Sequence, residues 1–414
     1  MSDLAPNHAT ASTPPSDRRV LTLLLAAALG TRLFLILVFP NLVVEFPDKV
    51  QRYDPVAQSL VRGEGFSRDG QPTATSPPAY PLFLAALYGT FGYSLRAVRI
   101  GLAVVDVLGC GMWFLAARRW FGRERAILTT IVLAFSPYLM YPILAGAGDT
   151  LFVAAHAILL WLVGRSLDRP SPARFALPGF MVGLAALCRP TALLLPFALL
   201  PAILVALRGK RVRRTVLSAA FLAAFVLTLT PWTVRNAVQF RRFIPIQSIG
   251  GRLLARASRP LHRQAKVDLT SPAPVPANEA EADQGRYSQV LREALARPLA
   301  TGQRLLTSMV TMWVSSHSGA LAPFLLPANV ALLVFAAAGI YATRHRAREQ
   351  LPLYCVVAYY VVVHSPFVAI FRYLLPTVPI LVMLASVPGV AFLGWLAHRL
   401  RALSRRSVTG EGAA

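Results

Sequence analysis

The feature that most constrains this chain is a succession of apolar runs, each close to the length that crosses the hydrocarbon core of a bilayer. A membrane-spanning helix needs about 20 apolar residues. Hydrophobic residues make up 55% of the 414-residue chain and charged residues only 14%, whereas soluble domains carry about 25% charged residues. The runs lie at about 20–40, 97–117, 126–144, 149–165, 175–188, 190–207, 214–232, 319–342, 351–370 and 374–397. The sequence therefore predicts an all-α polytopic membrane protein with about ten transmembrane helices.

Positive charge is concentrated in short connections between these runs. The chain has 42 Lys and Arg residues against 18 Asp and Glu, a net charge of +24. About half of the basic residues lie in connections that face one side if the helices alternate across the membrane. These connections are at residues 18–19, 118–125, 165–174, 208–214, 344–348 and 399–406. The charge therefore indicates orientation rather than nucleic-acid binding, and we expect a bacterial inner-membrane protein with both termini in the cytoplasm.

The remaining segments divide the chain into a single transmembrane domain, residues 18–400, and two tails. Residues 1–17 predict a disordered cytoplasmic tail, and residues 401–414 a second cytoplasmic tail. The first apolar run is interrupted by Arg32 and lacks a cleavage site, which favours a retained helix over a signal peptide. The runs within 175–207 are short and could form one re-entrant pair.

Two external segments are large, at about 41–96 and 233–318. In the first, apolar residues at helical spacing from Tyr53 to Val61 predict a short surface helix that ends at Gly63. A second helix, Tyr80 to Gly89, is too short to span and is expected at the membrane interface. In the second segment, residues 268–285 indicate a flexible linker or lid, and 286–314 has the spacing of a surface helix.

Five motifs along the chain resemble those of a known family. They are Tyr53-x-x-x-Ala57-x-x-Leu60-x-x-Gly63-x-Gly65-Phe66 with Pro77-Pro78-x-Tyr80-Pro81-x-x-Leu84; Ala147-Gly148-Asp149-Thr150-Leu151-Phe152; Gly183-Leu184-x-x-Leu187-Cys188-Arg189-Pro190; Pro231-Trp232-x-x-Arg235-Asn236-x-x-x-Phe240; and Phe371-Arg372-Tyr373-x-x-Pro376. In this order they are similar to C-type (GT-C) glycosyltransferases. The likeness is to the branch that holds protein O-mannosyltransferases, the lipid A aminoarabinose transferase and the rhizobial lipopolysaccharide transferases.

The resemblance implies an enzyme that moves a sugar from a polyprenyl-phosphate donor to an acceptor at the extracytoplasmic face, with inversion at the anomeric carbon. The acceptor would be a cell-envelope glycan, a lipid or a protein. An aspartate in the first external loop would act as base on the acceptor hydroxyl, and cationic donors would stabilise the departing lipid phosphate. No soluble nucleotide site is implied.

The candidate catalytic carboxylates are Asp48 and Asp149, with Asp54 in reserve. In the family the loop aspartate precedes the tyrosine by four residues, whereas here Lys49 holds that place and Asp48 lies five before Tyr53. The alternative for Asp54 is an acidic residue in a first helical turn, and for Asp149 an N-cap.

The candidate contacts to substrate and lipid phosphate are Arg189, Arg235, Arg372, Tyr53 and Tyr80. For the arginines the alternative is a side chain that extends from a helix end toward water. The acidic and histidine residues form no metal-binding motif, so we expect no tightly held metal. A loosely bound divalent cation near Asp48 and Asp149 is the alternative.

Two other function classes remain open at this point. A non-catalytic polyprenyl-lipid carrier or flippase would use arginines for phosphate but would not need the carboxylates. An oligosaccharide ligase of another membrane family would depend on arginine and on a histidine such as His317 instead of an aspartate base.

Overall fold

The computed structural model describes residues 15–47, 49–207, 211–258, 279–315, 322–367 and 369–409. These residues are almost entirely helical, which confirms the all-α prediction. The candidate base Asp48 and His317 both lie outside the described residues.

The first half of the chain supplies the first external loop and the early spans. Its elements are α1 (Pro15–Val38), the π-helical turn η1 (Lys49–Tyr53), α2 (Asp54–Val61), β1 (Ser67–Arg68), β2 (Gln71–Pro72), α3 (Ala79–Phe91), α4 (Leu95–Phe121), α5 (Arg123–Ala134), α6 (Pro137–Leu144), α7 (Asp149–Asp168), α8 (Pro172–Cys188) and the 3-10 turn η2 (Pro190–Ala192). Both predicted loop helices are present, as α2 and α3.

The second half begins with two further helices, α9 (Leu195–Ala206) and α10 (Arg211–Phe240). It continues with α11 (Gly250–Ala257), α13 (Glu279–Ala296), α14 (Pro298–Thr311), α15 (Ala322–Ala342), the 3-10 turn η3 (Arg344–Arg346), α16 (Ala347–His364), the 3-10 turn η4 (Phe371–Leu374) and α17 (Val378–Thr409).

Each predicted apolar run contains helix. However, fewer than ten of these helices are long enough to span the membrane alone. Within the described residues, five helices pass a test of length and apolarity, or seven if each of two bent pairs counts as one span. The bent pairs are α5 with α6, at 42°, and α15 with α16, at 70°. α8 and α9 have 17 and 12 residues, short of the roughly 20 that a spanning helix needs.

The predicted boundaries at three irregular segments change. Residues 15–17 form the first turn of α1, and α17 continues to Thr409, so helix replaces part of both predicted tails. Of the predicted linker at 268–285, residues 279–285 are already helical in α13, and the rest lies outside the described residues. Acidic residues in the first turn of α13, Glu279 and Glu281, favour this earlier start because they complement the helix dipole.

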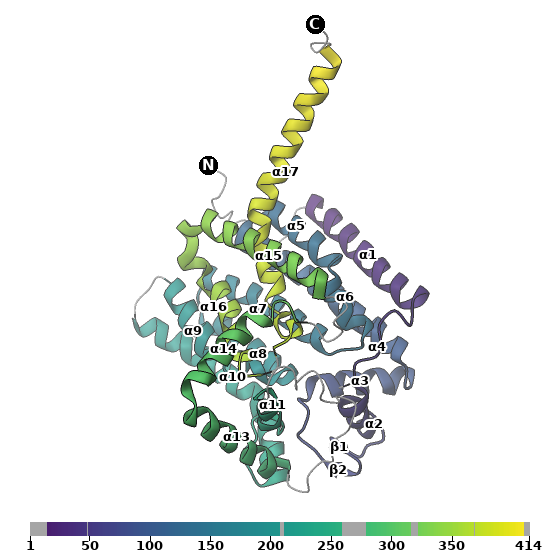
Figure 1. The fold of residues 1–414 in the computed structure, drawn as a ribbon, viewed down its shortest axis with the longest axis vertical. Helices are drawn as coiled ribbons and strands as arrows, with labels where there is room; N and C mark the ends of the chain where they lie inside the picture. The colour runs from purple at the N-terminus through teal and green to yellow at the C-terminus, as the bar shows by residue number, and fades with distance from the viewer. Residues whose placement is uncertain are drawn as a thin grey trace.

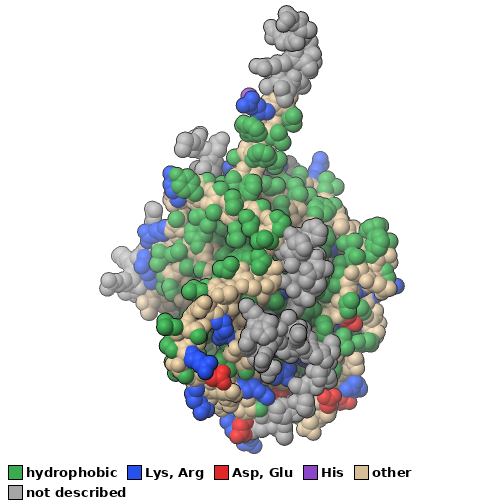
Figure 2. All heavy atoms as spheres, in the orientation of Figure 1, with side chains coloured by type: hydrophobic (Ala, Val, Ile, Leu, Met, Phe, Trp, Pro, Cys, Tyr) green, Lys and Arg blue, Asp and Glu red, His purple; other side chains and the backbone are tan. Residues whose placement is uncertain are grey.

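The two ends of the molecule differ in composition. α1 begins and α17 ends at one end, and β1, β2, α11 and α13 lie at the other (Figure 1). Figure 2 shows apolar side chains over the body between them and charged side chains of both signs at the end that carries α11 and α13. Apolar side chains such as Leu227 on α10 and Val334 on α15 are more than half exposed, as expected for helices in contact with lipid.

Close backbone packing joins α8 to α10. A Cβ atom at Gly179 would lie 2.0 Å from the carbonyl oxygen of Phe221, and one at Gly183 would lie 2.6 Å from the Cβ of Thr228. Small residues four apart allow this approach, as is typical of helices that pack in membranes.

A buried ion pair fixes α1 against α4 and α5. The guanidinium of Arg32, which is 1% exposed, donates from Nε to Asp106 Oδ2 at 2.8 Å and from Nη1 to the carbonyl of Ala134 at 2.8 Å. Inside the apolar body, a charge needs such a partner.

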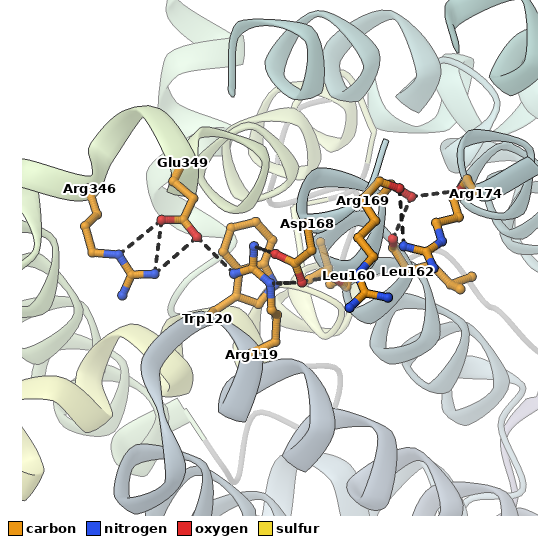
Figure 3. A network of polar contacts seen from close by, with 10 residues as sticks. Arg119, Trp120, Leu160, Leu162, Asp168, Arg169, Arg174, Arg346 and Glu349 are labelled. Atoms are coloured by element: carbon orange, nitrogen blue, oxygen red, sulfur yellow. Dashed lines mark hydrogen bonds and ion pairs between the residues drawn. The ribbon is translucent and has the colours of Figure 1, made fainter. Parts of the chain in front are cut away.

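A second network ties three helices together at the end where α17 leaves the body. Figure 3 shows Arg119 of α4 between Asp168 of α7 and Glu349 of α16. Its Nε donates to Asp168 Oδ2 at 2.7 Å and its Nη1 to Glu349 Oε1 at 2.9 Å. Arg346 binds the same Glu349 at 3.1 Å. Carboxylates therefore neutralise part of the basic charge that we expect on the cytoplasmic side.

We expect Arg119→Gln to lower the free energy of unfolding by about 1–3 kcal/mol, because a largely buried side chain loses charge-assisted hydrogen bonds to two helices. Reversible unfolding in mixed detergent micelles would measure it. Arg344→Gln is the matched control, since exposed Arg344 donates to the Tyr341 carbonyl on the adjoining helix and not to a carboxylate of the described residues. Equal stability of the two variants would contradict the prediction.

Candidate functional site

The site is built around the tight turn that precedes α7. Gly146 has a φ of +66°, and a Cβ at Gly148 would lie 2.7 Å from the ring of Tyr80 on α3. The Tyr80 hydroxyl donates to the Gly146 carbonyl. The glycines thus let the first external loop pack directly on the turn, and Asp149 follows as the first residue of α7. Gly148, not Asp149, holds the N-cap position.

Asp149 is held between two arginines from distant parts of the sequence. Its carboxylate accepts from Arg189 Nη2 at Oδ1 and from Arg372 Nε and Nη2 at Oδ2, the last two at 2.7 and 2.6 Å. Arg189 follows the last residue of α8, and Arg372 lies in η4. Asp149 is 2% exposed, so the carboxylate is fully desolvated and depends on both guanidinium groups for its charge.

Aromatic rings enclose this triad. The Arg372 guanidinium lies 3.6 Å from the centre of the Phe46 ring, and the Arg189 guanidinium lies 5.7 Å from the rings of Phe152 and Tyr373. Such cation–π contacts strengthen in a desolvated site. Phe46 belongs to the first external loop, and its backbone N–H donates to the Ala145 carbonyl at 2.9 Å.

The reserve base Asp54 lies in a separate buried network. Its carboxylate binds Lys49 Nζ at 2.7 Å and accepts from the hydroxyls of Tyr88 at 2.6 Å and Tyr93 at 3.0 Å. Lys49 also pairs with Glu45. Burial and the Asp54 carboxylate raise the pKa of Tyr88, which therefore stays protonated as a donor. The Asp54 carboxylate is thus already bound by three donors. Lys49, which stands at the family's aspartate position, has a structural role in this network.

The structure brings Tyr53 and Tyr80, two of the candidate contact residues, together. Their rings meet edge to face with centroids 5.1 Å apart, and the Arg52 guanidinium lies 5.3 Å from the centre of the Tyr53 ring. Tyr80 thereby connects the helix α2 region to the Gly148 turn.

Arg235 is placed differently from the other two candidate arginines. Its Nη1 donates to the Thr73 carbonyl and its Nη2 to the Phe66 carbonyl, both at 2.8 Å. Its guanidinium also lies 5.0 Å from the centre of the Trp232 ring. Arg235 therefore holds the β1–β2 hairpin on the C-terminal end of α10, whereas Arg189 and Arg372 hold Asp149.

The hairpin itself was missing from the sequence-based prediction. Asp69 and Gly70 both have positive φ, at 53° and 73°, and connect β1 to β2. An Asp-Gly pair between short strands is a hairpin signal, so the sequence did carry the information.

Two buried histidines pack beside the site. His156 Nε2 lies 2.7 Å from the Tyr360 hydroxyl, and the His364 ring stacks on Tyr373 with centroids 5.1 Å apart. Across the described ranges, no group of three or more His, Cys, Asp or Glu side chains is arranged to hold a metal ion.

Residues 75–234 match a family model described as dolichyl-phosphate-mannose-protein mannosyltransferase. No curated protein matches the sequence significantly. The fold is similar to that of the oligosaccharyltransferase of Archaeoglobus fulgidus, with 13% identity and a TM-score of 0.58. That match covers 95% of this chain and 52% of the archaeal protein, so this chain spans about half the length of its structural relative.

The same archaeal protein, AglB, has also been solved in complex with an inhibitory peptide and a dolichol-phosphate. That structure gives a TM-score of 0.58 at 13% identity, over 97% of this chain and 52% of AglB. ArnT from Cupriavidus metallidurans bound to undecaprenyl phosphate has 16% identity and a TM-score of 0.45, over 90% of this chain and 78% of ArnT. The similarity to the archaeal protein extends over nearly the whole chain, so it concerns the complete helical arrangement.

Proposed function

We propose that this chain is a membrane glycosyltransferase of the GT-C type, and that it transfers a sugar from a polyprenyl-phosphate donor to an acceptor hydroxyl at the extracytoplasmic face; the family match and the similar fold support this proposal. Transfer inverts the anomeric carbon, and the acceptor is a component of the cell envelope. One observation carries the proposal: a buried carboxylate paired with two arginines lies directly beneath the first external loop.

The described contacts favour a supporting role for Asp149. Both of its oxygens accept from guanidinium groups, so the carboxylate is poorly placed to take a proton from an acceptor. It fixes Arg189 and Arg372 in position instead. A planar guanidinium can bind two phosphate oxygens at once, so we propose that the same two arginines also contact the leaving phosphate during transfer.

Asp48 is our candidate base. It is bonded to Lys49, whose side chain contacts the Gly146 turn, and it lies two residues after Phe46, which covers Arg372. Asp54 is occupied by Lys49, Tyr88 and Tyr93. A base must come within hydrogen-bond reach of the attacking hydroxyl, and among the carboxylates of the first loop we assign this role to Asp48.

A lipid-phosphate donor is supported by two findings. The matched family model is described by a dolichyl-phosphate-linked sugar, and the archaeal structural relative has been solved with a dolichol-phosphate. The alternating aromatic and arginine contacts at Phe46, Arg372 and Arg189 suit a ligand that is apolar at one end and anionic at the other.

The purified protein in proteoliposomes provides the test. We expect it to consume polyprenyl-phosphate-linked sugar, release polyprenyl phosphate and label an acceptor from a cell-envelope extract. Several donor sugars should be tried, because the site geometry does not select one. Movement of the intact donor lipid between leaflets without loss of its sugar would overturn the proposal in favour of a flippase.

A further inference from the structure

Five arginines lie on elements that meet next to the site described above. They are Arg52 of η1, Arg68 of β1, Arg252 and Arg256 of α11, and Arg286 of α13, and they form what we call the arginine cluster. Partial burial and the positive charges of Arg52, Arg286, Arg256 and Arg68 lower the pKa of Arg252. Positive charges nearby act in this direction because they disfavour the charged form of the guanidinium.

Hydrogen bonds between the elements explain the convergence. Arg52 Nη2 donates to the Thr75 carbonyl at 2.7 Å. The adjacent Ala74 carbonyl accepts from the backbone N–H of Ser248 at 2.9 Å, two residues before α11. Asp283 of α13 accepts from the backbone N–H of Arg252 at 3.0 Å. Segments from three parts of the sequence therefore lie side by side.

The buried carboxylates of this region are already engaged. Glu279 accepts from the backbone N–H of Ala74 at 2.6 Å and from the Ser248 hydroxyl at 2.8 Å, and Asp283 accepts from the start of α11. Asp69 lies 3.3 Å from Arg68, but its side chain is 77% exposed, and exposed pairs contribute little.

Positive charge therefore remains in excess. Arg256 Nε is buried and donates to none of the described residues.

The cluster lies beyond the outer end of the spanning helices. α11 and α13 follow Phe240, the last residue of α10, and lie with β1 at the end where Figure 2 shows charged side chains (Figure 1). A polyprenyl chain stays in the bilayer. An arginine cluster beyond the spanning helices is therefore more accessible to a ligand in water than to the lipid-linked donor.

We propose that the arginine cluster binds phosphate or carboxylate groups of the acceptor, so that the acceptor is an anionic glycan or glycolipid headgroup. The inference rests on the proposed function, which supplies the need for an acceptor. Guanidinium groups suit this task because they bind two oxygens of a carboxylate or phosphate at once. The positive charges of the arginine cluster also attract anions to this end of the molecule.

The test compares Arg252→Gln/Arg256→Gln with the wild type in neutral detergent. Trigalacturonate and inositol hexakisphosphate serve as soluble anionic probes, and undecaprenyl phosphate as the lipid probe. Arg241→Gln/Arg292→Gln is the matched control, because both of these arginines are exposed and neither is among the charges that act on Arg252. Arg286→Gln is a second cluster variant in case the double variant folds poorly.

We expect the cluster variants to bind the soluble probes about 10 to 100 times more weakly, with the control and undecaprenyl phosphate binding unchanged. Equal binding of the soluble probes by all variants would overturn the inference. Weaker binding of undecaprenyl phosphate alone would also overturn it, by assigning the cluster to the donor phosphate. The binding measurement requires no sugar transfer. A failure of this inference would therefore not contradict the proposed transfer activity, and a failure to observe transfer would not change the binding result.

Discussion

Asp48→Asn is expected to reduce sugar transfer about 10²- to 10⁴-fold in a protein that still folds and binds polyprenyl phosphate. The amide has nearly the shape of the carboxylate but cannot accept the proton of the attacking hydroxyl. Transfer of labelled sugar in proteoliposomes measures the loss, and binding of undecaprenyl phosphate to the same preparation measures whether the donor site survives.

Two further variants make this result specific. Glu64→Gln removes a carboxylate from the same loop, where Glu64 pairs with exposed Arg62, and it should transfer sugar like the wild type. Asp54→Asn should lose stability together with activity, because Lys49 is 1% exposed and depends on that carboxylate. Full activity of Asp48→Asn would refute our assignment of the base, and selective loss in a stable Asp54→Asn protein would transfer the role to Asp54.

The local patterns of the sequence were sufficient for the helices and for much of the site. Apolar runs of adequate length predicted each spanning helix, and spacing around Tyr53 and Tyr80 predicted both loop helices. Asp149, Arg189 and Arg372 were each identified from a separate motif. Their mutual ion pairs could not be predicted, because contacts between residues 149, 189 and 372 depend on how α7, α8 and η4 pack and not on local spacing.

The same reason explains what was missed or placed differently. Arg235 was grouped with the other outer arginines, but its partners are carbonyls of Phe66 and Thr73, more than 160 positions away along the chain. The arginine cluster draws on three segments, each of which carries only ordinary basic residues in sequence. Backbone acceptors and long-range convergence leave no local signature, unlike a helix or a turn.

Asp149→Asn should both stop transfer and lower the free energy of unfolding by about 3–5 kcal/mol, because it leaves two largely buried guanidinium groups without their shared counter-charge. Asparagine caps helices as well as aspartate does, so this substitution separates charge from any capping effect. Unfolding in mixed micelles measures the stability, and proteoliposome transfer measures the activity.

A double-mutant cycle with Arg372→Gln identifies the cause. If the pair acts as a unit, Asp149→Asn should cost less in the Arg372→Gln background, with a coupling energy of about 1–3 kcal/mol. The control pair is Asp149→Asn with Arg344→Gln, whose effects should add, since Arg344 donates to the Tyr341 carbonyl at the other end of the molecule. A stable Asp149→Asn protein with normal transfer would refute the central role of the triad. A stable but inactive protein would instead show that the Asp149 charge is essential to the chemistry. The contacts of Arg189 and Arg372 with the rings of Phe46, Phe152 and Tyr373 would then be sufficient to keep the two arginines in place.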